Sequence, residues 1–87
     1  MEIECNEIIQ KKMVDIIHIR EETIKCDNNF IQMYGVVEFV ENDILYLRIK
    51  TDIIMLETEP NVDFFDYLNK NVCITLHEIY FYNTGIL

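Results

Sequence analysis

The chain has 87 residues, 51% of them hydrophobic, and its sixteen acidic and seven basic residues give a net charge of −9. This length predicts a single domain over residues 1–87, and the hydrophobic content excludes an intrinsically disordered chain. No apolar run approaches the length of a membrane span, and the first residues are acidic, unlike those of a signal peptide. We therefore expect a cytoplasmic protein without membrane contact, and its charge favours a basic partner over nucleic acid.

The composition also bears on the source and on the redox state. The chain lacks alanine, serine and tryptophan and is rich in isoleucine and asparagine. This bias is typical of A+T-rich coding DNA and suggests a low-GC bacterium or its phage. The three cysteines, Cys5, Cys26 and Cys73, are odd in number and widely spaced, which predicts free thiols in a reducing compartment.

The first predicted element covers residues 7–17 and is ambiguous. Its isoleucines and Met13 fall on one face of a helix, and Asn6 is placed to cap that helix. The same stretch is rich enough in β-branched residues to form a strand. We expect a short helix from Glu7 that gives way to a strand near Ile16.

A hairpin follows over residues 23–34. Asparagine accepts the positive φ of a type I′ turn, so Asn28-Asn29 is predicted to be its two-residue loop. This loop pairs Cys26 with Ile31 and fixes the register of both strands.

The second hairpin is predicted to turn at residues 41–43. A three-residue loop there pairs Phe39 with Leu45 and Val37 with Leu47, so that all four side chains are apolar and point inward. A two-residue loop would mix inward and outward residues, because a slip of one residue sends side chains to the wrong face.

The rest of the chain is predicted to contain a long strand, a short helix and a bent strand. The strand after the hairpin continues to Met55 with a bend near Thr51, and residues 61–70 indicate a short helix. The last strand, residues 72–82, changes phase at His77, which indicates a bulge or a corner. This order favours a mainly β fold with minor helix, a small partly open antiparallel barrel of OB- or SH3-like type.

No pattern in the sequence favours catalysis, a metal or a cofactor. The histidines and cysteines lack the close pairs that zinc sites use. Cys73 and His77 share a face of a predicted strand but lie about 13 Å apart along it, too far for a nucleophile and its base. The paired carboxylates resemble solvated edges, and a small filled barrel leaves little room for a substrate. We expect a protein that is not an enzyme.

One predicted face resembles the surfaces on which proteins stack single-stranded nucleic acid. It comprises Tyr34, Tyr46, Arg48 and Lys50, two aromatic rings and two cations. Two cations are few against the net charge of −9, and Glu38 lies beside Tyr46. Nucleic-acid binding through this face is therefore the alternative to the function preferred below.

The preferred binding surface is acidic. Glu57, Glu59, Asp63 and Asp66 lie within ten residues, around a loop and the start of a predicted helix. Fixed carboxylates on a rigid domain attract a basic surface and can occupy a groove that otherwise binds phosphates. The sequence thus predicts a small non-catalytic protein-binding module, an inhibitor or adaptor that acts on a basic partner.

A third hypothesis is a structural subunit of a homo-oligomer. Tyr80 and Tyr82 on the last strand, with Val36 and Val40 on the second hairpin, are predicted to be apolar outward positions. The last strand also lacks the proline or lysine that protects a sheet edge. We expect self-association, as a homodimer, through Tyr80 and Tyr82.

Overall fold

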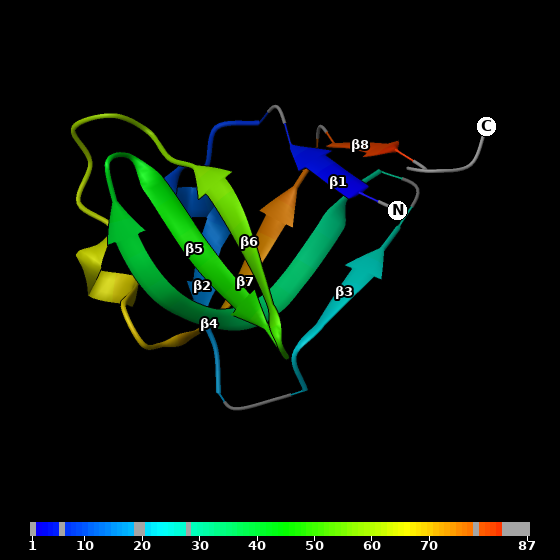
Figure 1. The fold of residues 1–87 in the computed structure, drawn as a ribbon, viewed down its shortest axis with the longest axis horizontal. Coiled ribbons are helices and arrows are strands. Elements are labelled where there is room, and N and C mark those ends of the chain that lie inside the picture. The colour runs from blue at the N-terminus through cyan, green and yellow to red at the C-terminus, as the bar shows by residue number, and fades with distance from the viewer. Residues whose placement is uncertain (1, 6, 19–20, 28, 78, 83–87) are drawn as a thin grey trace.

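The computed structural model describes residues 2–5, 7–18, 21–27, 29–77 and 79–82, with side chains for those between residues 7 and 77. This part of the chain contains eight strands and two very short 3-10 helices, and Figure 1 labels the strands. The elements are β1 (Glu2–Cys5), η1 (Lys11–Met13), β2 (Val14–Ile16), β3 (Thr23–Cys26), β4 (Ile31–Glu41), β5 (Ile44–Ile49), β6 (Asp52–Glu57), η2 (Phe65–Tyr67), β7 (Asn71–Leu76) and β8 (Ile79–Tyr82).

Six strands form one antiparallel sheet in the order β2-β7-β4-β5-β6, with β3 also paired to β4. β1 and β8 pair with each other in a separate two-stranded sheet. β4 is the longest strand and is bent (Figure 1), so its first half lies between β3 and β7 while its second half pairs with β5. One strand therefore organises both parts of the large sheet.

The two ends of this sheet approach each other without closing a barrel. Ile9, which precedes β2, forms an isolated parallel bridge with Thr58, which follows β6. The Ile9 N–H donates to the Glu57 carbonyl at 2.8 Å, and the Glu59 N–H donates to the Ile9 carbonyl at 3.0 Å. The finer OB- or SH3-like assignment stays a prediction.

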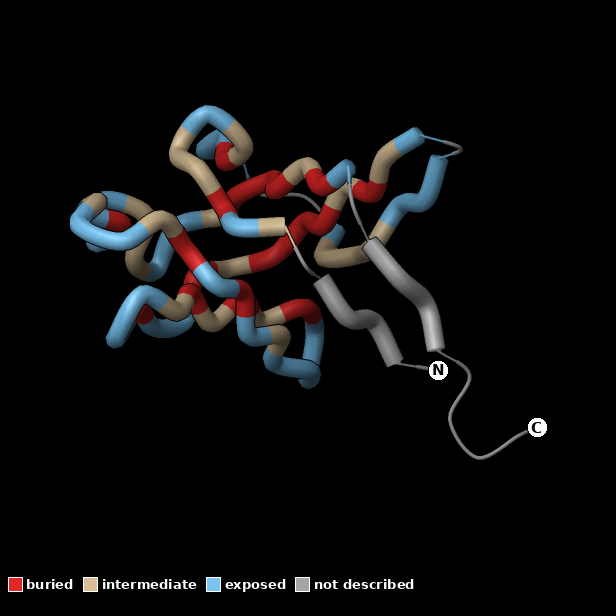
Figure 2. Tube along the Cα trace, turned by 90° about the horizontal axis from the view of Figure 1, so that it is seen from above, coloured by how far each residue is buried: buried red, intermediate tan, exposed pale blue. Residues whose placement is uncertain are grey.

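Apolar side chains on the inner side of the bent sheet form one core cluster. Figure 2 shows the exposed residues gathered in the turns and loops, with buried stretches along the strands. Phe64, only 1% exposed, joins the cluster from the segment before η2 and so anchors that segment to the sheet. Burial of such a ring contributes roughly 1.5–3 kcal/mol.

The mainly β antiparallel class is confirmed, and so is the register of the first hairpin. Cys26 lies opposite Ile31 as predicted, whereas the turn predicted at Asn28-Asn29 includes Asn28, which lies outside the described residues. Val72, Ile74 and Leu76 of β7 are fully buried, which confirms the predicted inward face of that strand, and Cys73 between them is also buried.

The three-residue loop predicted at residues 41–43 is wrong. Phe39 lies opposite Tyr46, and the strands are joined by the two residues Asn42 and Asp43, which have φ angles of 53° and 61°. Asparagine and aspartate tolerate this left-handed region, and two such residues in succession match the twist of the flanking strands.

The far half of the same hairpin keeps the predicted register, with Val37 opposite Leu47 and both side chains fully buried. The two halves are reconciled by a shift of one residue between Val37 and Phe39, which makes Glu38 the extra residue of a β-bulge. As a result Phe39, predicted to point inward, is 49% exposed, whereas Val40, predicted to point outward, is buried.

The predicted long third strand is two strands. β5 ends at Ile49 and β6 begins at Asp52, with Lys50 in the turn at a φ of 58°. The Lys50 N–H donates to the Glu22 carboxylate at 2.5 Å, so a residue from before β3 holds this turn.

The two predicted helices are corrected to 3-10 turns. Residues 7–16 contain η1 followed directly by β2, and residues 61–70 contain η2. Asn61 and Asn69 both have a φ of 62°, which cannot continue a right-handed helix and limits η2 on both sides. Within the described residues, no helix is both long and apolar enough to span a membrane.

Candidate functional site

The predicted acidic surface lies on the segment that runs from the end of β6 into η2. Glu57, Asp63 and Asp66 are exposed, and Glu59 is half-buried. Asp63 accepts the Phe65 N–H at 2.8 Å, which holds the start of η2. The buried ring that precedes η2 fixes this segment to the core, so its carboxylates are displayed from an anchored backbone.

Asp66 differs from the other three carboxylates because it carries an ion pair. Its Oδ2 lies 3.4 Å from the Lys11 Nζ, in an exposed contact of the kind that contributes little to stability. Among the described residues, no ion pair involves Glu57, Glu59 or Asp63. These three charges therefore remain available to a cationic partner.

The turn between β4 and β5 brings a further carboxylate to this segment. The Asp43 carbonyl accepts the Thr58 N–H at 2.8 Å, and Asp43 lines one shallow hollow with Glu57 and another with Asp63. We call Asp43, Glu57 and Asp63 the acidic end. Three exposed carboxylates around shared hollows create a local negative potential. The sequence indicates Asp43 only as a turn residue and a solvated carboxylate, since nothing local shows that this turn meets the loop after β6.

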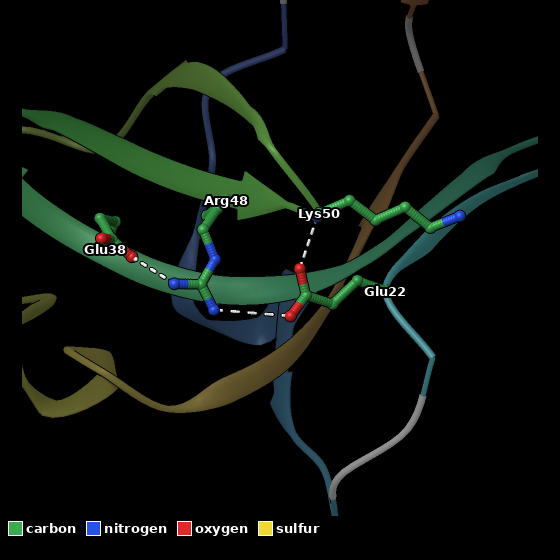
Figure 3. A network of polar contacts seen from close by, with 4 residues as sticks. All are labelled: Glu22, Glu38, Arg48 and Lys50. Carbon is green, nitrogen blue, oxygen red and sulfur yellow. Dashed lines mark hydrogen bonds and ion pairs between the residues drawn. The ribbon is translucent and has the colours of Figure 1, made fainter.

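Arg48, the central cation of the predicted nucleic-acid face, lies between two carboxylates (Figure 3). Its Nη1 is 3.2 Å from the Glu38 Oε2, and its Nη2 is 3.5 Å from the Glu22 Oε2. The other Glu22 oxygen accepts the Lys50 N–H. The guanidinium is thus already neutralised and offers little positive potential to a phosphate group.

The structure does not bring together the other members of that face. Tyr34 is only 8% exposed, and its ring centre lies 5.6 Å from the Lys25 Nζ rather than beside Lys50. Lys50 is exposed in the β5–β6 turn. Tyr46 is half-buried and packs against Phe39, with ring centres 5.9 Å apart.

The outer side of strands β4 to β6 carries an apolar row that the sequence did not predict. Phe39 lies opposite Tyr46, and Tyr46 lies opposite Met55 on β6. Phe39 is 49% and Met55 66% exposed, and Ile53 on the same strand is 50% exposed. We call Phe39, Tyr46 and Met55 the outer apolar row. Contiguous exposed apolar side chains often mark an interaction surface.

The proposed self-association residues, Tyr80 and Tyr82, belong to β8, whose backbone pairs with β1. Their side chains lie outside the described residues, so their part in an interface stays a prediction.

Two residues weighed for catalysis lie in different environments. Cys73 is buried, and His77 is exposed with its ring 6.4 Å from that of Phe30. In the described part of the chain, no three His, Cys, Asp or Glu residues are grouped to hold a metal ion.

Comparisons with protein families, with curated proteins and with solved structures found no match for this chain.

Proposed function

We propose that this protein is a small non-catalytic binding module that recognises a basic surface of another protein and acts as an inhibitor or adaptor. The observation that carries the proposal is the acidic end, Asp43, Glu57 and Asp63, exposed around two shared hollows with no ion pair in the described part of the chain. In the free protein these like charges repel one another. A cationic partner relieves that repulsion and is steered toward the surface.

The outer apolar row supports the same proposal, because protein interfaces combine an apolar centre with a polar rim. The Ile44–Glu57 pair lies two residues beyond the Tyr46–Met55 pair and therefore on the same face of the sheet, so acidic and apolar surface are continuous across β5 and β6. A partner that covers both would bury apolar area and place cations near the carboxylates.

The test begins with the immobilised protein, which captures its partner from cells of the source organism for identification. Association kinetics with that partner are then compared for the double variant Glu57→Gln/Asp63→Asn and the matched control Asp15→Asn/Glu21→Gln. The control removes two exposed carboxylates that carry no ion pair in the described residues and lie elsewhere in the fold, Asp15 on β2 and Glu21 just before β3.

We expect the first variant to slow association roughly three- to tenfold and to flatten its salt dependence, because long-range steering depends on local charge. Its melting temperature should barely change, since exposed charges contribute little to stability and the amide that replaces the Asp63 carboxylate retains an oxygen that can accept the Phe65 N–H. Equal effects of the two variants would show that the negative charge serves solubility alone.

The nucleic-acid alternative predicts the opposite dependence. Tyr46→Ala and Arg48→Ala would abolish binding to a single-stranded oligonucleotide, while the acidic variant would bind it better because repulsion falls. The position of Arg48 between Glu22 and Glu38 favours the protein partner over this alternative. The homo-oligomer hypothesis is tested separately by light scattering.

A further inference from the structure

β6 is the terminal strand of the large sheet. One of its sides pairs with β5 along the whole strand, from Ile44 opposite Glu57 to Ile49 opposite Asp52. On its other side, the described residues supply the bridge from Ile9 near its end and no further strand.

The bridge shows which backbone groups of β6 face away from β5. The Ile9 N–H donates to the Glu57 carbonyl, so the backbone of Glu57 points away from β5. Alternate residues of a strand present their N–H and C=O groups to the same side. Ile53 and Met55 therefore direct their N–H and C=O groups outward as well, where no described residue forms a hydrogen bond with them.

The side chains of β6 define what such an edge would accept. Ile53 and Met55 are 50% and 66% exposed, and the apolar stretch between them is bracketed by the exposed carboxylates of Asp52 and Glu57. β6 carries none of the lysine, proline or bulge by which proteins usually protect an exposed edge. A strand complementary to the outer edge of β6 would therefore have a short apolar centre and a basic residue at each end.

We infer that the outer edge of β6 binds an extended segment of a partner protein by strand addition, and that this segment is apolar in the middle and basic at both ends. The inference rests on the proposed function for the charge of the partner. A second copy of the chain is a poorer occupant, because it would bring the same two carboxylates and another net charge of −9 to the edge. Strand addition also extends the outer apolar row by one strand, since Met55 belongs to both.

The test uses the capped peptide Lys-Lys-Val-Val-Val-Val-Lys-Lys as the probe and amide hydrogen exchange by NMR as the readout. At saturating peptide we expect the Ile53 and Met55 amides to exchange about tenfold more slowly, while the Ile54 amide, which faces β5, is unchanged. A peptide with glutamates in place of the lysines should not bind. Equal binding by the acidic peptide would overturn the charge argument.

A pair of variants separates the backbone from the side chain. Met55→Pro removes an outward N–H without removing a bond to β5, a substitution that edge strands tolerate. It should abolish the effect of the peptide, whereas Met55→Ala keeps the N–H and should weaken binding by less than about threefold. Both variants are first checked for an unchanged circular dichroism spectrum. Full peptide binding by Met55→Pro would overturn strand addition.

The outcomes also distinguish this inference from the proposed function. Peptide binding that perturbs the acidic end but leaves the Ile53 and Met55 amides unprotected overturns strand addition while leaving the proposed function intact, and no peptide binding overturns strand addition as well. Protection of these amides that rises with protein concentration in the absence of peptide would identify a second copy as the occupant and overturn the inference.

Discussion

Gly35 lies in β4, where a single added methyl group should destabilise the protein. At an ordinary strand position, Gly→Ala would stabilise by about 0.4–1 kcal/mol, because it restricts the unfolded chain. The φ angle of Gly35 is outside the left-handed region, so backbone conformation does not demand glycine. A Cβ at this position, however, would collide with the Arg48 carbonyl oxygen and lie 3.0 Å from the Ile49 Cγ1.

The collision decides the sign of the effect. Overpacking of this kind costs roughly 1–3 kcal/mol, and the atom that must move belongs to the backbone of β5 rather than to a flexible side chain. After the entropic gain is subtracted, Gly35→Ala should lose about 1–2 kcal/mol and melt roughly 5–15 °C lower.

Thermal and urea denaturation followed by circular dichroism measure this change. In the double variant Gly35→Ala/Ile49→Ala the side-chain clash with Ile49 is removed but the collision with the Arg48 carbonyl remains. The double variant should therefore be less than about 1 kcal/mol more stable than the sum of the two single losses predicts. An unchanged or higher melting temperature for Gly35→Ala would refute the close approach of β4 and β5 at this point.

Three further predictions use the same denaturation assay or NMR. Leu47→Ala should cost about 2–4 kcal/mol, because Leu47 is fully buried, whereas the exposed Met55→Ala should stay within about 0.5 kcal/mol; similar losses would show that the two faces are reversed. Deletion of Glu38 should preserve cross-strand NOEs on both sides of the bulge, and a slipped hairpin would contradict this. Asp43→Gly should stabilise the protein by up to about 1 kcal/mol, because glycine adopts the left-handed φ of 61° without strain. The same change should slow association with a basic partner, because it removes one carboxylate of the acidic end. A loss of stability would show that the Asp43 side chain supports the turn.

Local patterns were sufficient where one stretch of sequence determines its own geometry. The register of the first hairpin was predicted correctly from the alternation of its two flanking strands, with Cys26 opposite Ile31. Two inward residues of β5, Leu45 and Leu47, were also predicted correctly, and both are fully buried. In both cases the hydrophobic period and the turn chemistry agree.

Features held by distant residues could not be predicted in this way. The β5–β6 turn at Lys50 contains no glycine, proline or asparagine, and the carboxylate of Glu22, from a distant segment, holds its backbone and the neighbouring Arg48. The acidic end likewise depends on a contact between the β4–β5 turn and the distant loop after β6. Only this contact brings Asp43 close to the carboxylates that the sequence had grouped together.

The bulge at Glu38 links the error in the hairpin to the chemistry of the surface. The part of β4 next to the turn pairs with β5 as in a regular two-residue hairpin, and the part before the bulge pairs as in a regular three-residue hairpin. The inserted residue lets both parts of β4 keep their buried partners on β5. Because Glu38 and Phe39 then point outward in succession, Phe39 leaves the core and packs beside Tyr46. The same insertion places the Glu38 carboxylate against Arg48. One extra residue thus creates the outer apolar row and neutralises the nearest cation, and both effects make this face better suited to a protein than to a nucleic acid.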